Sequence, residues 1–203
     1  MISIVNYELG NVLSVQNAIK KIGHDCIITR DEVELARSDA IILPGVGSFE
    51  KGINNLKKFN LINILNNQVL NNKKKILGIC LGFQLMCDFS EEFGKYSGLS
   101  WLNLKVSKIK SLNHKLPHVG WNKLQIVKNN KIFKDISEKE LFYFNHSYCV
   151  EINTDKQCET LAECKYGGKF ITALKKNNIF GIQPHPEKSQ YQGLKVLKNF
   201  IEF

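Results

Sequence analysis

The residues with the clearest chemical potential are Gly78-Ile79-Cys80-Leu81-Gly82, a cysteine between two glycines. This G-x-C-x-G spacing predicts a strand that turns sharply into a helix, with the sulfur exposed at the turn. A helix N-terminus favours the thiolate, which is the form of cysteine that attacks a carbonyl carbon. We therefore interpret Cys80 as a nucleophile and expect the Leu81 N–H to point at a developing oxyanion. The motif alone also fits a buried structural cysteine.

A cysteine nucleophile needs a base, and His185 has the most constrained surroundings of the histidines, in Gln183-Pro184-His185-Pro186-Glu187. A residue before proline favours an extended backbone, and side chains two apart in an extended chain point the same way. His185 and Glu187 are therefore predicted to face together. A carboxylate beside an imidazole fixes its tautomer and stabilises the imidazolium that forms when it takes the thiol proton.

A third segment, Pro44-Gly45-Val46-Gly47-Ser48, directly follows the apolar run 40–43. Its glycines allow backbone N–H groups to approach a ligand oxygen and to complete an oxyanion hole with Leu81. A tight strand-to-helix turn capped by Ser48 is the other interpretation of this segment. Open α/β sheets collect their active sites at the carboxyl ends of strands, so we expect the three segments to meet at one sheet edge.

The elements that must position these segments alternate over the first 90 residues. Apolar runs predict strands at 2–5, 26–29, 40–43 and 76–79, and helical periodicity predicts helices at 12–22, 49–72 and 83–89. Buried strands alternating with helices favour a doubly wound, mainly parallel α/β sheet flanked by helices.

The second half is expected to be rich in β-structure, since short strand-like runs separated by turns extend from about 100 to 182. Strands are predicted at 106–109, 123–127, 141–144, 147–150, 170–174 and 179–182, with a last helix at 189–202. Because no linker-like stretch or internal repeat interrupts the chain, residues 1–203 are predicted to form a single domain.

Composition excludes several classes of protein. Hydrophobic residues are 43% of the 203 residues, which is ordinary for a globular chain, and no apolar run is long enough for a membrane span. The net charge of +9 comes almost entirely from lysine, with arginine only at Arg30 and Arg37, which argues against a nucleic-acid partner. Scattered cysteines and the absence of a secretion-like N-terminus suggest a cytoplasmic protein with no metal site.

The motif Gly78-Ile79-Cys80-Leu81-Gly82-Phe83-Gln84, together with His185-Pro186-Glu187, resembles the class I (triad) glutamine amidotransferases. Within that class, the segments 44–47, 117–122, 146–148 and 185–190 are similar to the glutaminase subunits of imidazole glycerol phosphate synthases. The resemblance extends over essentially the whole chain. It implies an enzyme that needs no cofactor, hydrolyses L-glutamine and passes the ammonia to a (β/α)8-barrel cyclase in a heterodimer of histidine biosynthesis.

The resemblance also implies a role for individual residues. Cys80 would form a glutamyl thioester, His185 would be the acid/base and Glu187 its orienting partner. The positions that match the glutamine site are Gly45, Val46, Gly47, Leu81, Gln84, Ser147 and Tyr148. Those that match the contact with the partner are Trp121, Asn122, Tyr143 and Lys188. Plain core aromatics remain the alternative for Trp121 and Tyr143.

Three positions depart from the family's usual pattern: Phe83, where Met is common, Asn145, where an apolar residue precedes the histidine, and Pro184, where Phe precedes His-Pro-Glu. Two other functions therefore stay open. A paralogous glutaminase could feed ammonia to a synthetase that aminates or amidinates a surface sugar. Alternatively, the strand-to-helix turn at Cys80 could have lost its catalytic role, and the chain could be a non-catalytic scaffold, although Cys80, His185 and Glu187 are all present.

Overall fold

The structure is a computed structural model that describes residues 1–111, 114–152 and 157–203. Its centre is a run of parallel strands in the order β2-β1-β3-β4-β14. These are β1 (Ile2–Val5), β2 (Cys26–Thr29), β3 (Ala40–Leu43), β4 (Lys75–Ile79) and β14 (Ile179–Ile182). All of β1, β3, β4 and β14 except Lys75 is buried, which explains their continuous apolar sequences.

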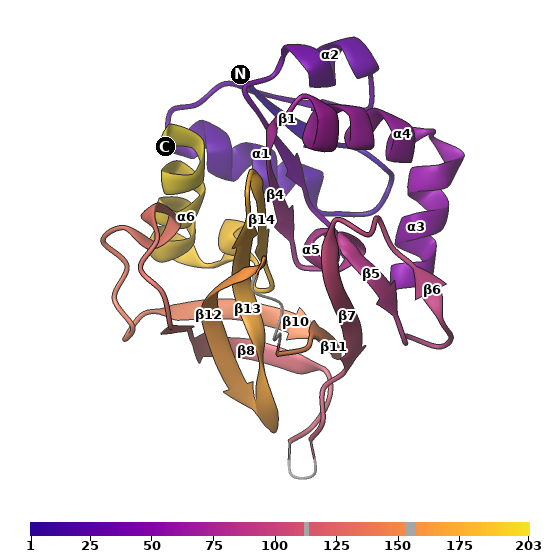
Figure 1. Ribbon diagram of the computed structural model, residues 1–203. Helices are drawn as coiled ribbons and strands as arrows, with labels where there is room; N and C mark the ends of the chain where they lie inside the picture. The colour runs from indigo at the N-terminus through magenta and orange to yellow at the C-terminus, as the bar shows by residue number, and fades with distance from the viewer. Residues whose placement is uncertain (112–113, 153–156) are drawn as a thin grey trace.

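Helices cover both faces of this sheet (Figure 1). Alternate strand residues face opposite sides, so Ile42 packs in one core with helices α1 and α6 whereas Ile41 packs in the other with α2 to α5. The first pair is α1 (Val12–Lys21) and α6 (Gln190–Glu202). The second group is α2 (Glu32–Arg37), α3 (Phe49–Lys58), α4 (Leu61–Asn66), a π-helical turn (Asn67–Asn71) and α5 (Leu81–Leu85). Two covered faces confirm the doubly wound α/β prediction.

The second half of the chain extends the sheet with mostly antiparallel strands, confirming the expected β-rich half. The complete sheet is 12-stranded, and β8 and β10 form a separate antiparallel pair. The additional strands are β5 (Cys87–Ser90), β6 (Tyr96–Ser97), β7 (Leu102–Lys108), β8 (His118–Lys123), β9 (Gln125–Ile126), β10 (Leu141–His146), β11 (Tyr148–Val150), β12 (Glu159–Tyr166) and β13 (Gly168–Lys176). Short 3-10 turns lie at Lys131–Phe133 and Pro186–Lys188.

The predicted helix at 83–89 is wrong in its second half, because α5 ends at Leu85 and the chain continues as β5. The returning segment explains this: Leu99 N–H donates to the Leu85 carbonyl and Trp101 N–H to the Met86 carbonyl. Those acceptors are therefore used by a distant part of the chain.

Other boundaries also differ from the predictions. The helix predicted at 49–72 is broken at Asn60, which has a left-handed backbone (φ 54°). The strand predicted at 123–127 is divided between the end of β8 and β9. Helix α2 and strand β12 were not predicted.

The pairing of the central strands fixes the place of the site. Ile79 at the end of β4 pairs with Ile182 at the end of β14, and Gly78 pairs with Leu43 at the end of β3. The residues that follow these three strands therefore emerge side by side, as predicted for the Cys80, His185 and 44–48 segments. None of the helices in the described ranges is both long and apolar enough to cross a membrane.

Candidate active site

Cys80 occupies a strained turn between β4 and α5. Its backbone has φ 53° and ψ −110°, and its N–H donates to the Ile182 carbonyl at 2.8 Å. A Cβ at Gly78 would lie 2.7 Å from the Phe83 Cα, and one at Gly82 would lie 1.8 Å from the Leu43 carbonyl oxygen. Both glycines of the G-x-C-x-G motif are thus required by close backbone packing, as predicted for the sharp strand-to-helix turn. The predicted exposure of Cys80 is wrong, because the residue is only 5% exposed and meets the cavity from within the fold.

His185 and Glu187 lie together, as predicted, but the predicted extended backbone ends at His185, and a 3-10 turn at Pro186–Lys188 brings Glu187 back to the imidazole. The His185 Nδ1 is 2.8 Å from the Glu187 Oε1, and both side chains are 2% exposed. The backbone of His185 is fixed because its N–H donates to the Tyr143 carbonyl at 2.9 Å and its carbonyl accepts from the Ser189 hydroxyl at 2.6 Å. The imidazole is therefore held by the Glu187 carboxylate, and the main chain of His185 is held by Tyr143 and Ser189.

The charges around His185 favour its protonated form. Burial lowers the pKa of His185, but the Cys80 thiolate, its hydrogen bond to the imidazole, and the Glu187 carboxylate together raise this pKa well above its ordinary value. A thiolate–imidazolium pair is the state in which a cysteine is ready to attack and a histidine is ready to donate a proton.

A cavity of about 240 Å³ opens in front of these groups. Six of the residues predicted for the glutamine site line it, together with both Cys80 and His185: Val46, Gly47, Leu81, Gln84, Ser147 and Tyr148. The sulfur-bearing and imidazole-bearing residues therefore share one small cavity.

Gly45, also predicted for the glutamine site, does not line the cavity but packs directly behind it. A Cβ at Gly45 would lie 2.5 Å from the Tyr7 hydroxyl oxygen and 2.7 Å from the Gly82 N. The fully buried Tyr7 donates its hydroxyl hydrogen to the Pro44 carbonyl at 2.7 Å. Gly45 therefore lets the segment 44–47 approach the N-terminus of α5, and Tyr7 holds that segment in place.

Two residues at the site were missed by the sequence analysis. Glu92 lines the cavity, and its Oε2 accepts a hydrogen bond from the Phe49 N–H at 2.6 Å. Burial raises the pKa of Glu92, although that hydrogen bond lowers it in part. The Gln183 amide approaches Cys80, with its Nε2 3.6 Å from the Sγ. Gln183 lies in the segment of the His185 motif, but no local pattern indicates its contact with Cys80, and Glu92 carries no local motif.

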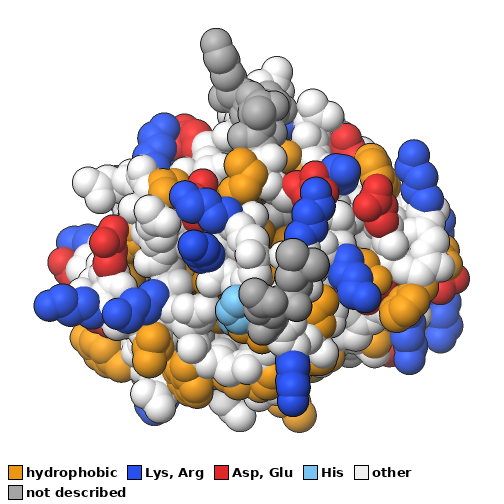
Figure 2. All heavy atoms as spheres, turned by 90° about the horizontal axis from the view of Figure 1, so that it is seen from below, with side chains coloured by type: hydrophobic (Ala, Val, Ile, Leu, Met, Phe, Trp, Pro, Cys, Tyr) orange, Lys and Arg blue, Asp and Glu red, His pale blue; other side chains and the backbone are white. Residues whose placement is uncertain are grey.

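Three of the four residues predicted for the partner contact, Trp121, Tyr143 and Lys188, lie together beside His185, whereas Asn122 pairs opposite the buried Phe142 and so faces the other side of β8. The Trp121 and Tyr143 rings are 5.9 Å apart and the Lys188 Nζ is 5.7 Å from the centre of the Tyr143 ring, while Asn122 is next to Trp121 on β8. Trp121 is 45% exposed, so the plain-core alternative is wrong for this residue. Figure 2 views the molecule from below Figure 1, the side where β8 and β10 lie, and shows hydrophobic side chains along one edge with lysines spread between them.

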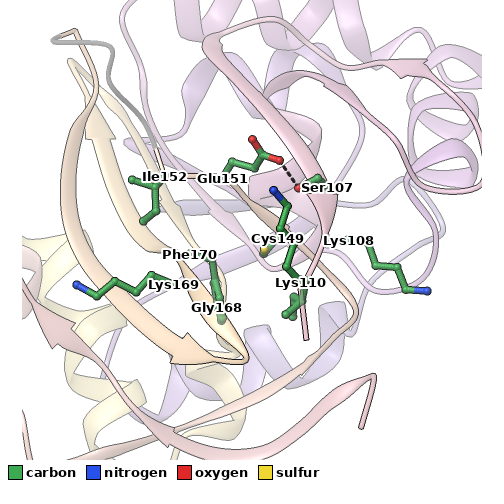
Figure 3. Close-up of a pocket in the computed structure, with 10 residues that line it drawn as sticks. Ser107, Lys108, Lys110, Cys149, Glu151, Ile152, Gly168, Lys169 and Phe170 are labelled. Atoms are coloured by element: carbon green, nitrogen blue, oxygen red, sulfur yellow. Dashed lines mark hydrogen bonds between the residues drawn. The ribbon is translucent and has the colours of Figure 1, made fainter. Parts of the chain in front are cut away.

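A second cavity, of about 330 Å³, lies on the other side of β11 (Figure 3). Tyr148 lines the first cavity and its neighbour Cys149 lines the second, as strand alternation requires. In Figure 3 the side chains of Lys108 and Lys169 extend away from the cavity, and Glu151 accepts a hydrogen bond from Ser107. Cys80, His185 and Glu187 do not line this cavity, whereas Cys80 and His185 line the first one. Among the residues described, no group of three or more His, Cys, Asp or Glu side chains could hold a metal ion.

Together, the fold and this site define a class of thiol enzyme: a doubly wound sheet that presents a cysteine and a histidine to one cavity, with a buried glutamate holding the histidine. The model of the class-I glutamine amidotransferase family matches residues 3–203. Subunit HisH 2 of imidazole glycerol phosphate synthase from Methanococcus maripaludis is 46% identical over 203 residues, covering 100% of this chain and 99% of that protein. Subunit HisH 1 of the same synthase from Campylobacter jejuni is 44% identical over 202 residues, covering 99% of both chains.

The chain therefore belongs to the class-I glutamine amidotransferases, in the HisH family of imidazole glycerol phosphate synthase subunits. A crystal structure of a glutamine amidotransferase from Thermotoga maritima has the same fold. Its TM-score is 0.65 at 16% identity, with 100% of this chain and 98% of that chain covered. At this identity the likeness concerns the fold alone.

Proposed function

We propose that this chain hydrolyses L-glutamine to glutamate and ammonia, as the glutaminase subunit of an imidazole glycerol phosphate synthase. The observation that carries the proposal is the meeting of Cys80 and His185 at one 240 Å³ cavity, with His185 held by the buried Glu187. Relatives named for this synthase, 46% and 44% identical over nearly the full length, support this pathway over a sugar-modifying paralogue.

The first half of the reaction transfers the glutamyl group to sulfur. The Cys80 thiolate attacks the side-chain amide carbon of glutamine, forming a carbon–sulfur bond and a tetrahedral oxyanion. The Leu81 N–H, at the start of α5, and an N–H of the segment 45–47 stabilise this oxyanion. His185 then donates its proton to the amide nitrogen as the carbon–nitrogen bond breaks, which releases ammonia and leaves a thioester.

The second half regenerates the enzyme. The now neutral His185 takes a proton from water, whose oxygen attacks the thioester carbon. Collapse of the second tetrahedral intermediate breaks the carbon–sulfur bond, releases glutamate and restores the thiolate–imidazolium pair. Glu187 stays ionised throughout, because its role is to fix the tautomer and to stabilise the charge on His185.

Glutamine recognition needs a partner for its α-ammonium group, and Glu92 is an acidic side chain that lines the cavity. The Phe49 N–H holds one of its oxygens, which orients the carboxylate. We assign Glu92 this role in addition to the predicted contacts from Gln84, Ser147 and Tyr148.

The ammonia that the proposed reaction releases must be consumed by a second protein, which is the synthase partner. Trp121, Asn122, Tyr143 and Lys188 form the partner face, and the partner is a cyclase with a (β/α)8 barrel.

The whole of residues 1–203 acts as a single amidotransferase domain. The working compartment is the cytoplasm, whose reducing conditions preserve a catalytic thiol.

The test is to reconstitute the chain with its cyclase and to measure synthesis with either glutamine or an ammonium salt as the nitrogen source. We expect Cys80→Ala to lower glutamine-dependent synthesis at least about 100-fold and to leave ammonium-dependent synthesis intact. Cys26→Ala, at a partly exposed cysteine on β2, is the matched control. Glutamine-dependent synthesis by Cys80→Ala close to the wild-type rate would refute the proposal.

A further inference from the structure

The residue after β14, Gln183, reaches the nucleophile from the neighbouring strand. Its N–H donates to the Thr172 carbonyl at 2.8 Å, which continues the ladder between β14 and β13. Its side chain is completely buried, with the Nε2 3.6 Å from the Cys80 Sγ, a hydrogen-bond distance for sulfur. The contact follows from the fold, since Ile182 pairs with Ile79 and the next residues on both strands are neighbours.

The surrounding contacts fix which end of the Gln183 amide faces the sulfur. Gln84 donates from its Nε2 to the Tyr148 backbone carbonyl at 2.8 Å, and a carbonyl can only accept. The same nitrogen is 3.0 Å from the Gln183 Oε1, which must then be the acceptor. The Gln183 Nε2 is left pointing to the Cys80 Sγ, so the order of donors and acceptors is set by a main-chain group.

An amide N–H at this place distinguishes the two protonation states of the sulfur. It donates to a thiolate, but the amide nitrogen cannot accept a hydrogen bond from a thiol. The Gln183 amide cannot turn its oxygen to the sulfur without losing the hydrogen bond that this oxygen accepts from Gln84. The sulfur of a thiol is only a weak acceptor, so the amide N–H bonds a thiolate more strongly, and this difference favours the charged form.

We propose that Gln183 is a positioning residue that keeps Cys80 as a thiolate and aims it at the cavity. The chain from the Tyr148 carbonyl through Gln84 and Gln183 to Cys80 connects the wall of the glutamine site with the nucleophile. The expected effect of Gln183 on turnover rests on the proposed glutaminase function, whereas its expected effect on the Cys80 sulfur does not. The thiolate is needed both for attack and as the leaving group of the thioester, so turnover depends on Gln183 in both halves of the reaction.

The test measures the pH dependence of iodoacetamide alkylation at Cys80, followed by mass spectrometry of the peptide that contains it. Gln183→Met removes the donor at similar volume, and Gln183→Glu keeps an acceptor for Gln84 while placing a carboxylate beside the sulfur. Gln68→Met is the matched control, because Gln68 is also buried (3% exposed) but lies in the π-helical turn after α4. Thermal melting of each variant checks its folding.

We expect both Gln183 variants to alkylate Cys80 about tenfold more slowly than wild type at pH 6 and equally fast at pH 10, with Gln68→Met unchanged. In the reconstituted enzyme, kcat for glutamine hydrolysis should fall about tenfold with KM within about twofold. A folded Gln183 variant with the wild-type alkylation profile would overturn the inference, and if Gln183→Met does not fold, Gln183→Glu decides. Absence of glutamine hydrolysis in the wild type would instead refute the proposed function, because alkylation needs no glutamine.

Discussion

The His185 Nδ1 lies 2.8 Å from the Glu187 Oε1, and the two side chains are buried beside each other. This contact leaves the other ring nitrogen for the nucleophile, since the carboxylate accepts the Nδ1 proton. In the proposed mechanism the two residues have separate roles: His185 carries the proton in each step, whereas Glu187 orients the ring and stabilises its charge.

We therefore expect Glu187→Gln to be milder than His185→Asn. His185→Asn removes the acid and base and should lower glutamine hydrolysis by about 10⁴-fold or more, with Glu187→Gln retaining about 10 to 100 times more activity than that variant. Steady-state hydrolysis in the reconstituted enzyme measures both. Equal losses, or a larger loss for Glu187→Gln, would contradict the assignment of roles.

Stability should fall in mild acid because of a buried histidine pair next to the cavity. His146 donates from Nδ1 to the Tyr148 carbonyl at 2.8 Å, and its Nε2 lies 3.3 Å from the His118 Nδ1. Burial lowers the pKa of His118 to about 4 and that of His146 to about 3. The unfolded chain therefore binds more protons below pH 6.5, and the free energy of unfolding decreases as the pH falls from about 6.5 towards 4.

The variant His118→Gln should make the free energy of unfolding depend less steeply on pH. The slope of that free energy against pH should decrease by on the order of 1 kcal/mol per pH unit between pH 6 and 5. Denaturant titrations at several pH values give the slope, which is independent of any offset that the substitution causes at pH 7. His24→Gln, at a partly exposed histidine bridged to Glu202, is the control and should leave the slope as it is in wild type. A slope in His118→Gln equal to that of wild type would show that the pair does not titrate as described.

Gly82→Ala should damage the elbow severely. Its Cβ would lie 1.8 Å from the Leu43 carbonyl oxygen, so β3 and α5 would have to move apart, at a cost of about 3 kcal/mol or more. Gly168→Ala is the control, since its Cβ would meet nothing closer than 3.5 Å. Thermal melting should place Gly82→Ala well below Gly168→Ala, and similar melting temperatures would mean that the elbow has room to relax.

Docking of the cyclase should depend on the exposed face of β8. Val119 (55% exposed) lies two residues before Trp121, and Val33 (53% exposed) lies on α2, at the opposite end of the molecule in Figure 1. Because burial of an uncompensated charge is unfavourable, Val119→Asp should weaken the complex at least about tenfold, whereas Val33→Asp should not. Titration calorimetry of each variant with the cyclase compares them, and equal dissociation constants would place the interface elsewhere.

The isolated chain should hydrolyse glutamine slowly until the partner binds. Gly47 has φ 102°, and glycines flank Val46 on both sides, so a peptide flip in this segment is sterically easy. A misdirected oxyanion donor costs about 10² to 10³ in rate, and partner binding should restore it. Hydrolysis is measured for the chain alone and then with the cyclase and a nucleotide substrate analogue. Equal rates would exclude this form of regulation, and a change in KM alone would indicate ordering of the pocket instead.

Local chemistry made the framework of the site predictable from the sequence. The apolar runs of β1, β3, β4 and β14 are continuous because helices cover both faces of the sheet, and the glycines around Cys80 are there because backbone atoms approach within contact distance. The contact of His185 with Glu187 could be predicted because the two residues are only two apart in the chain, although a 3-10 turn at Pro186–Lys188, and not an extended chain, brings them together. Each of these features depends on neighbours in the sequence.

What only the tertiary structure decided depends on residues far apart in the chain. Gln183 meets Cys80 across 103 residues because β14 pairs with β4 in one register, and no pattern around Gln183 specifies that partner. The same reason explains the end of α5, whose carbonyl groups are taken by Leu99 and Trp101, and the entry of Glu92 into the cavity. Sequence patterns report which face of an element is buried, but the partner that buries it is selected by the packing of the whole chain.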